Sequence, residues 1–332
     1  NVHIGGGFEL LKSLLASFDE NDDVQFVLDE RIVNLLDISS LQHVYFVKPN
    51  PVSRFKAEVF ISRLKHKHNK IFCFHGLPPV FYNGAEIIVF LQNRLYISGF
   101  SVSGYNFKTS LRLTFERLMF YTLRSKVAEF IVQSNSMKAQ TELNLKKLKS
   151  ILVTVQPFIS QEPPYVSTEL LEKKYDFVYI ADGSAHKNHQ TLFTAWRLLA
   201  ENGHYPTLLV TLSDDNIQLI ETIEKLNNEY SCKIINVGYV SKETVYKVYQ
   251  QTAALIYPSL VESFGMPLIE AKQYGLAVVA AELDYVRDVV TPNETFNPHS
   301  SVSISLSVLR YIGEPSPLVK LKNPHEFISY LK

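Results

Sequence analysis

The stretch YPSLVESFGMPLIEA, residues 257–271, places two glutamates, Glu262 and Glu270, around a Phe-Gly pair and a Met-Pro pair. The apolar run AALIY before it is typical of a buried strand, and Pro267 with Gly275 beyond it predicts a short helix. Gly265 allows the backbone to lie close to a ligand, and a helix N-terminus favours negative charge. We expect Glu262 in the loop and Glu270 in the first helical turn. The alternative is an ordinary turn with two solvated acids.

Short apolar runs alternate with longer helical patterns along the rest of the chain. The runs are rich in Val, Ile and Phe on both faces, which suits parallel strands covered by helices. The proline-rich stretch 157–174 has neither the two-residue period of a strand nor the 3.6-residue period of a helix. It separates two series of alternating strands and helices. The pattern predicts two doubly wound, Rossmann-like α/β domains, residues 1–160 and 161–332, that face a central cleft. We also expect the last helix to pack back on the N-terminal domain.

The composition narrows the class of protein. The 332 residues are 46% hydrophobic and 20% charged, which is enough for two cores. The zero formal net charge argues against a dedicated nucleic-acid binder, although residues 1–165 carry roughly +5 and residues 166–332 roughly −5. No apolar run reaches the roughly 18 to 20 residues of a membrane span, and no signal-peptide pattern opens the sequence. Cys73 and Cys232 are predicted to be buried, reduced thiols, which favours the cytoplasm.

Ligands of open parallel sheets bind beyond the carboxyl ends of the strands. This rule selects four groups of residues from the N-terminal domain: Gly5–Gly7, His75–Gly76, Gln92–Asn93 and Ser134–Asn135. From the C-terminal domain it selects Ala181–Asn188, Thr211–Ser213, Gly238–Tyr239 and Pro258–Glu270. We expect all of them to line one cleft between the domains.

Several of these residues have two interpretations. The glycines 5–7 lead into a helix and suit either a phosphate-facing loop or a plain tight turn, while Leu10 excludes the dinucleotide fingerprint. Lys187 is either a cation that neutralises a diphosphate or a surface lysine. His75, at a strand end, is either functional or structural. His186 and His189 are three residues apart, but nothing nearby completes a metal site.

The opening stretch resembles the E-x7-E signature of retaining glycosyltransferases of family four, of the type that builds bacterial surface polysaccharides. The matching positions are Pro258-Ser259, Glu262, Phe264-Gly265, Pro267, Glu270-Ala271, Gly275 and Val278-Val279. Residues 176–199 are similar to the family's diphosphate loop, with Lys187 at its lysine, and residues 235–259 to its base-binding loop. In one departure, Asp182-Gly183-Ser184 stands where many members carry an arginine.

The resemblance implies the GT-B fold and the transfer of a hexosyl group, with retention of configuration, from a UDP- or GDP-linked sugar to a hydroxyl of a glycan or lipid-linked glycan. No metal or other cofactor is implied. The catalytic residues would be Glu262 on the donor sugar, Lys187 on the diphosphate and His75 at the reacting centre. Further donor-binding residues would be Gly6, Gly7, Gly238, Tyr239, Ser263, Phe264, Gly265, Met266 and Glu270, the last on the ribose.

The acceptor side is less determined. Gln92, Asn93 and Ser134 of the N-terminal domain are the candidate acceptor-binding residues. The basic stretches 53–70 and 138–149 predict either contact with an anionic membrane or solvated helix faces. We therefore expect a cytoplasmic protein. If its acceptor is lipid-linked, we expect the protein at the inner face of the cytoplasmic membrane. The alternatives are a GT-B partner subunit that binds the nucleotide sugar without catalysis, and a nucleotide-sugar epimerase.

Overall fold

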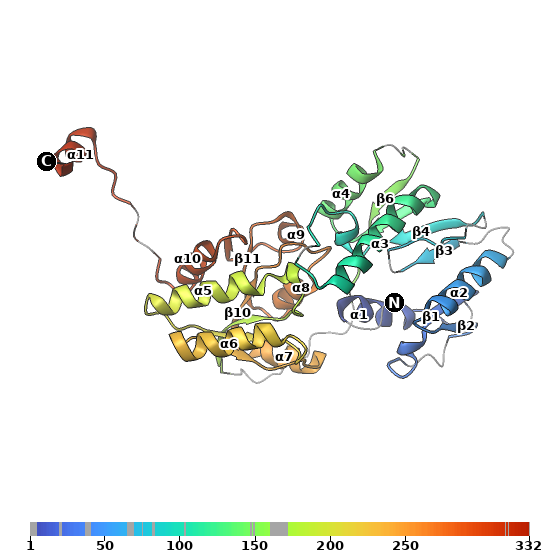
Figure 1. Ribbon diagram of the computed structural model, residues 1–332, viewed down its shortest axis with the longest axis horizontal. Helices are drawn as coiled ribbons and strands as arrows, with labels where there is room; N and C mark the ends of the chain where they lie inside the picture. The colour runs from blue at the N-terminus through green and yellow to red at the C-terminus, as the bar shows by residue number, and fades with distance from the viewer. Residues whose placement is uncertain are drawn as a thin grey trace.

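The structure, a computed structural model, describes residues 5–19, 22–36, 41–64, 70–74, 76–81, 84–102, 104–146, 148, 150–159, 172–315, 317 and 319–331. Two α/β halves follow one another along the chain (Figure 1). We call residues 5–159 the front half and residues 172–331 the back half. The boundary predicted at 160 and 161 lies outside the described residues.

The back half is built on a six-stranded parallel sheet in the order β12-β11-β10-β7-β8-β9. Its strands are β7 (Tyr175–Tyr179), β8 (Thr207–Val210), β9 (Lys233–Asn236), β10 (Thr252–Tyr257), β11 (Ala277–Ala281) and β12 (Glu294–Phe296). The chain moves outward from β7 to β9 and then returns to place β10 beside β7. The strand order therefore reverses between β7 and β10, and ligands bind at such a switch point.

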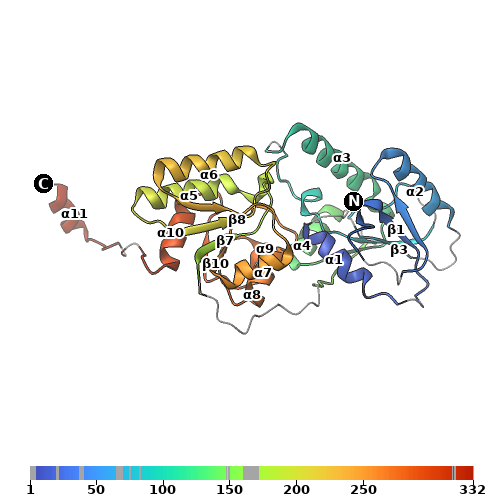
Figure 2. The ribbon, with the colours of Figure 1, turned by 90° about the horizontal axis from the view of Figure 1, so that it is seen from below.

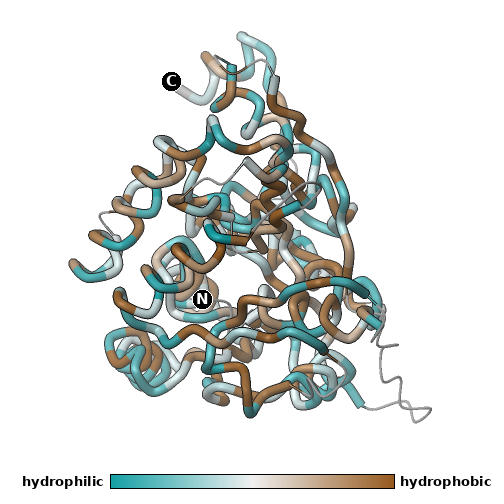
Figure 3. The backbone as a smooth tube through the Cα atoms, turned by 90° about the vertical axis from the view of Figure 1, so that its right-hand side faces the viewer, coloured by the Kyte–Doolittle hydropathy of each residue, from teal (hydrophilic) through white to brown (hydrophobic). Residues whose placement is uncertain are grey.

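Helices cover both faces of this sheet (Figure 2). They are α5 (His189–Glu201), α6 (Ile217–Tyr230), α7 (Lys242–Gln250), α8 (Met266–Gln273), α9 (Asp284–Arg287) and α10 (Ser301–Tyr311). Among them, α5, α6 and α7 each carry an apolar stripe. In α5, Leu192, Trp196 and Leu199 recur at helical spacing and are buried against the sheet. Figure 3 shows the resulting alternation of hydrophobic and hydrophilic residues along the helices.

The front half contains a two-stranded sheet, β1-β2, and a four-stranded sheet, β3-β4-β5-β6, both parallel. The strands are β1 (Phe26–Asp29), β2 (Val44–Val47), β3 (Lys70–Cys73), β4 (Glu86–Phe90), β5 (Glu129–Val132) and β6 (Leu152–Val155). The helices are α1 (Gly5–Leu15), α2 (Pro51–Arg63), α3 (Phe107–Leu123) and α4 (Asn135–Leu145). Cys73 and Cys232 are both free thiols. No helix in the described part of the chain is long and apolar enough to cross a membrane.

Three predictions about helices need correction. Gly6 and Gly7 are not in a loop, because α1 already begins at Gly5. Glu270 lies in the second turn of α8, since that helix begins at Met266. The last helix, α11 (Pro324–Leu331), does not pack on the front half. It stands at the opposite end of the molecule (Figure 1), and the side chains of residues 324–330 are exposed.

Three elements after residue 283, namely α9, β12 and α10, have no clear pattern in the sequence and were not predicted. β12 has only three residues, too few for a visible period, and α9 has four. The helix α10 is rich in Ser and Val, which are poor helix formers. It forms because Ile304 and Val308 pack into the core of the back half.

Candidate functional site

A buried ion pair lies at the switch point of the back sheet. Lys187 ends the short helix η4 (Ala185–Lys187) after β7, and Glu262 stands in the loop after β10. The Lys187 Nζ atom is 2.6 Å from Glu262 Oε1, and the two side chains are only 15% and 12% exposed. The hydroxyl of Tyr257 donates a second hydrogen bond to the same oxygen, at 3.0 Å. Two residues that are 75 positions apart thus form one charged centre.

Both groups of this pair are held ionised. Burial by itself raises the pKa of the Glu262 carboxyl, but the nearby charge of Lys187 and a hydrogen bond from its ammonium outweigh it, so the pKa lies below the ordinary value. Burial likewise lowers the pKa of Lys187, and the charges of Glu262 and Asp182 reverse the effect and raise it. A buried charge is tolerated only when it is paired in this way.

Buried tyrosines fix the loop that carries Glu262. Tyr285 donates to the carbonyl oxygen of Ser259 at 2.7 Å, and Tyr179 donates to the carbonyl oxygen of Lys187 at 2.8 Å. The hydroxyl groups of Tyr179 and Ser259 are also 2.8 Å apart. Burial raises the pKa of both tyrosines well above the ordinary value, so they remain protonated donors. The loops after β7 and β10 are therefore joined into one unit.

The next residues form the N-terminus of α8. Gly265 has φ +74°, a backbone conformation that other residues rarely adopt, and a Cβ atom there would lie 2.9 Å from Leu268 Cδ1. Pro267 stands in the first turn, where its missing N–H costs nothing. On the front half, a Cβ on Gly6 would lie 3.6 Å from Met266 Cγ. The N-termini of α1 and α8 thus meet. At α8 the Leu268 N–H already donates to the Gly265 carbonyl oxygen at 2.9 Å, and a helix N-terminus also carries the positive end of the helix dipole.

Glu270 lies apart from Glu262 and has its own partners. Its Oε2 atom accepts a hydrogen bond from the Tyr249 hydroxyl at 3.2 Å. Burial raises the pKa of the Glu270 carboxyl, and the charge of Glu9 raises it further. Glu9, on α1, is 3.4 Å from Lys242 Nζ on α7. This pair is a second contact between the halves, close to Glu270.

The segment 182–184 stands where many members of the family that the sequence resembles carry an arginine. Asp182 accepts a hydrogen bond from the Ser184 backbone N–H at 2.8 Å. At Gly183 a Cβ would collide with the side chain of Asn216, so a larger residue there would require the Asn216 side chain to move. His186 lies near Glu262, but burial first and then the charge of Lys187 lower its pKa, so it is neutral at pH 7. Lys187 is therefore the one cation that contacts the carboxylate of Glu262 within the described residues.

The two histidines considered as metal ligands have different surroundings. The Nδ1 atom of His186 is 2.6 Å from the hydroxyl of Tyr105, a residue of the front half. His189 is buried between Tyr179 and Phe193, and burial lowers its pKa to about 4. Within the described ranges, no three His, Cys, Asp or Glu side chains gather into a group that could hold a metal ion.

The front half contacts the Glu262 loop directly. The guanidinium of Arg94, in the short helix η2 (Arg94–Tyr96), donates to the carbonyl oxygen of Glu262 at 3.2 Å and to Gln140 Oε1 at 3.2 Å. Ser134 Oγ donates to the carbonyl oxygen of Ser263 at 3.3 Å. The backbone N–H of Ser136 donates to Asp288 Oδ2 at 2.9 Å. The start of α4 and η2 thus brace the loop from the opposite side.

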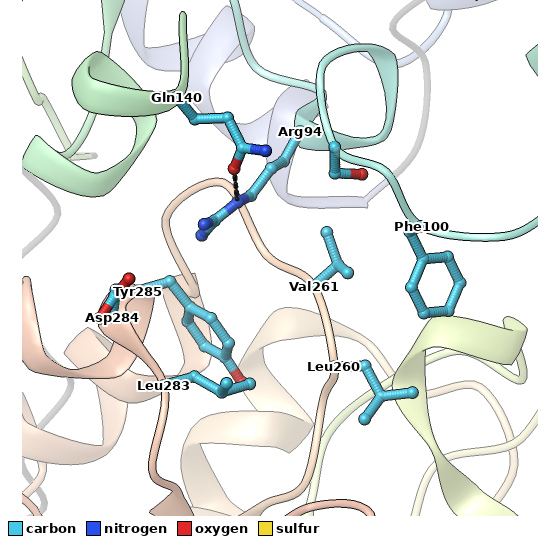
Figure 4. A pocket seen from close by; sticks show the side chains of 9 residues that line it. Arg94, Phe100, Gln140, Leu260, Val261, Leu283, Asp284 and Tyr285 are labelled. Atoms are coloured by element: carbon cyan, nitrogen blue, oxygen red, sulfur yellow. Dashed lines mark hydrogen bonds between the residues drawn. The ribbon is translucent and has the colours of Figure 1, made fainter. Parts of the chain in front are cut away.

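A cavity of about 190 Å³ lies beside this contact, between the halves. Figure 4 shows Arg94, Phe100 and Gln140 reaching it from the front half, and Leu260, Val261 and Leu283 to Tyr285 from the back half. The guanidinium, the Gln140 amide and the Asp284 carboxylate supply polar groups, while Phe100 and Tyr285 supply aromatic surface. This combination suits a polar ligand with apolar ring faces.

The other predicted residues take varied positions. His75 lies outside the described residues. Gln92 donates to the carbonyl oxygen of Phe74 at 2.8 Å, and Asn93 caps η2 by accepting from the Leu95 N–H at 3.0 Å. Gly238 has φ +72°, and Tyr239 after it is 82% exposed at the end of β9. Phe264 is buried under the α8 N-terminus.

Sequence reasoning missed the partners of these residues: Arg94, Tyr249, Tyr257 and Asp288. Arg94 directly follows Gln92 and Asn93, which were selected because they come just after a strand. Selecting one more residue after that strand would have included Arg94. The tyrosines carried no such signal, because a tyrosine in an apolar strand, like Tyr257, or on the buried face of a helix, like Tyr249, is ordinary core.

Residues 166–327, just under half of the chain, match the family model described as Glycosyl transferases group 1. The O-antigen chain mannosyltransferase B of Escherichia coli is 27% identical over 144 residues, which are 42% of this chain and 37% of that protein. A serotype-specific mannosyltransferase WbdA of Escherichia coli is 28% identical over 116 residues, 34% of this chain and 14% of that protein. The matches thus span well under half the length of these relatives.

The fold is that of GT-B proteins, with two Rossmann-like domains. The structure of Alr3699/HepE of Anabaena in complex with UDP and glucose is similar with a TM-score of 0.68, over 94% of this chain and 87% of that one, at 16% identity. The lipopolysaccharide outer core galactosyltransferase WaaB in its apo form has a TM-score of 0.60, over 94% and 88%, at 16% identity. The predicted fold class is confirmed.

The ion pair makes a prediction about stability. Lys187→Met leaves the Glu262 carboxylate buried without its cation, which should lower the free energy of unfolding by about 3–5 kcal/mol. Combining Lys187→Met with Glu262→Gln should restore much of this loss, because the unpaired charge is gone. Urea denaturation of the four proteins of this double-mutant cycle measures the coupling. Additive losses in the double variant would show that the two groups do not interact.

The contact from Arg94 makes a prediction about the loop. Arg94→Ala removes the donor to the Glu262 carbonyl oxygen, so the backbone amides of residues 260–265 should exchange hydrogen at least tenfold faster. Asp288→Ala should act in the same direction, since Ser136 loses its acceptor. Hydrogen exchange followed by mass spectrometry measures this, with Lys138→Ala on the outer face of α4 as the matched control. Equal protection in Arg94→Ala and the control would contradict the bracing role.

Proposed function

We propose that the chain is a glycosyltransferase that moves a hexosyl group from a nucleotide-diphosphate sugar to a hydroxyl of a glycan or lipid-linked glycan. The observation that carries the proposal is the Lys187–Glu262 pair at the switch point, opposite the converging N-termini of α1 and α8. The family match over residues 166–327 covers both members of this pair. The mannosyltransferase and galactosyltransferase relatives support an acceptor from lipopolysaccharide or another surface polysaccharide.

The back half binds the donor in this proposal. The diphosphate lies between Lys187 and the N–H groups of α1 and α8, where Gly6 and Gly265 keep the backbones open. Glu270, in its polar surroundings of Tyr249 and Lys242, accepts hydrogen bonds from the ribose. The base stacks near Gly238 and the exposed Tyr239. UDP is bound by the similar structures of HepE and of the O-GlcNAc transferase GtfA, which supports a nucleotide in this place.

Catalysis follows from where charge develops. As the bond from the sugar to the phosphate breaks, negative charge grows on the diphosphate. Lys187 and the helix N-termini meet that charge without rearranging, in a site largely closed to water. Asp182 and Glu262 both interact with Lys187. The Asp182 carboxylate therefore weakens the stabilisation of the diphosphate by Lys187, unless the diphosphate displaces one of the two carboxylates from this cation.

Retention of configuration fits the state of Glu262. Its carboxylate is engaged by Lys187 and Tyr257, and its pKa lies below the ordinary value, so it acts as a hydrogen-bond acceptor for sugar hydroxyls. We assign it no role as a nucleophile. The acceptor hydroxyl then attacks on the face that the diphosphate leaves, and the diphosphate oxygen takes the proton. No metal is required for these steps.

The acceptor enters from the front half in this proposal. The cavity lined by Arg94, Gln140 and Asp284 opens beside Glu262, and its aromatic walls suit a sugar ring. Ser134 lies at the same seam, where its hydroxyl already contacts the Ser263 carbonyl oxygen. Gln92 and Asn93 remain predicted acceptor residues, and His75 remains the predicted orienting residue. A lipid-linked acceptor would place the protein at the inner face of the cytoplasmic membrane.

The first test is turnover by the purified chain. UDP- and GDP-linked hexoses are mixed with glycan and lipid-linked acceptors, with and without EDTA, and release of nucleotide diphosphate is followed. Lys187→Ala should slow release at least a hundredfold, because a cation at the leaving group is lost, while Lys272→Ala on the exposed side of α8 should not. NMR of the product linkage reports the configuration.

The alternatives give different products in the same assay. An epimerase would release free epimerised sugar without acceptor, and a partner subunit would bind the donor but neither transfer nor hydrolyse it. Loss of turnover in EDTA that added Mg²⁺ restores would overturn the metal-independent scheme.

The raised pKa of Glu270 predicts a pH-dependent donor affinity. Ribose hydroxyls stabilise the ionised carboxylate, so nucleotide affinity should be full at neutral pH and fall as pH drops through a value above the ordinary pKa of about 4.3. Glu270→Gln should bind more weakly and lose this dependence. Tyr249→Phe removes a donor to the carboxylate and should move the profile to higher pH. Calorimetry with UDP and GDP from pH 4.5 to about 8 measures it, and identical profiles for all three proteins would refute the assignment.

A further inference from the structure

Helix α3 is apolar on two opposite faces. Leu113, Phe120 and Leu123 are buried against the front half. On the outer face, Phe107 is 83% exposed, Leu111 60%, Phe115 59% and Leu118 60%. These four recur at three- and four-residue spacing and form one stripe. A row of exposed large apolar side chains usually marks an interaction surface, and no part of the chain that the structure describes covers this stripe.

A second group of exposed apolar side chains lies on α2. There Val52 is 65% and Phe55 59% exposed. Phe55 contacts the ring of Phe81 edge to face, at 5.7 Å between centroids. The backbone N–H of Val80 donates to Glu58 Oε2 of α2 at 2.9 Å, and Lys126, just after α3, donates to the carbonyl oxygen of Val80 at 2.7 Å, so this segment connects α2 with the end of α3. Both helices belong to the front half (Figures 1 and 2). We call these residues the α2–α3 surface.

Cations accompany the exposed apolar side chains. Lys108 and Arg112 lie along one flank of the stripe, each one residue beyond Phe107 or Leu111. On α2, a hollow of about 270 Å³ is lined by Phe55, Lys56, Val59, Phe60 and Arg63. Residues 51–150 hold sixteen Lys and Arg against five Asp and Glu, whereas residues 1–50 hold three against eight. The positive charge is thus concentrated in the segment that carries the surface.

We propose that the α2–α3 surface docks on an anionic lipid bilayer, with Phe107, Leu111, Phe115 and Leu118 in the boundary between headgroups and acyl chains. A basic amphipathic face of this kind lies in the plane of the membrane interface. Anionic headgroups supply the complement to Lys108, Arg112 and the rim of the hollow. The basic stretch 138–149 is not the docking element, because α4 there points Met137, Thr141 and Leu145 inward and exposes Leu143 alone among its large apolar residues.

The docking does not depend on the proposed activity and is tested with the intact chain. Flotation with vesicles of phosphatidylcholine, with and without about one third phosphatidylglycerol, measures the bound fraction at low and high salt. The wild type should float with the anionic vesicles only, and less at high salt. Leu111→Ser combined with Phe115→Ser should lower the partition coefficient at least tenfold, and Lys108→Gln combined with Arg112→Gln should lower it severalfold.

The matched control is Ile217→Ser, which changes a side chain of similar exposure, 62%, on α6 of the back half and should float like the wild type. Circular dichroism verifies that the variants are folded, as expected for surface positions. Equal flotation of the Leu111–Phe115 variant and the control would overturn the proposal, and so would a wild type that does not float. A dimer in solution that Leu111→Ser dissociates would also overturn it, since a second copy would then be the occupant.

Discussion

The buried contact between Lys187 and Glu262 is the interaction on which the rest of the site depends. Neither charge could be buried alone, because the free energy lost with its hydration would exceed the stabilisation that the surrounding protein dipoles provide. The two loops that carry them must therefore come together at the one place where the back sheet brings β7 and β10 side by side. The tyrosines around Ser259 then hold this arrangement, and the fold, the loop geometry and the electrostatics support one another.

The front half shares in this arrangement. Arg94 and Ser134 bind carbonyl oxygens of the Glu262 loop, so the loop is held by both halves. Arg117 of α3 in turn donates to the carbonyl oxygens of Leu95 and Phe100 at 2.7 Å each, which fixes the segment carrying Arg94. A continuous set of hydrogen bonds thus runs from α3, through η2, to the loop at the switch point. A bilayer contact at α3 and a ligand at Glu262 would act on the same segment.

The absent arginine has consequences for the electrostatics of the site. Asp182 and Glu262 both raise the pKa of Lys187, so the cation is shared between two carboxylates before any ligand arrives. His186 is close but neutral at pH 7. An incoming diphosphate would therefore rely on Lys187 and on backbone N–H groups at two helix N-termini. Gly6 and Gly265 lie at these two N-termini, where a Cβ atom would lie 3.6 Å from Met266 Cγ and 2.9 Å from Leu268 Cδ1.

The sequence by itself determined the fold class and several residues of the candidate site. Apolar runs predicted the strands, and Gly265, Pro267 and the two glutamates marked the loop and helix after β10, because glycine and proline impose local backbone geometry. Only the tertiary structure paired Lys187 with Glu262, brought Arg94 to the same loop and left one face of α3 without a covering element. These outcomes depend on contacts between residues far apart in the chain. No local sequence pattern encodes such contacts. The sequence around an apolar residue also does not show whether the fold buries or exposes it.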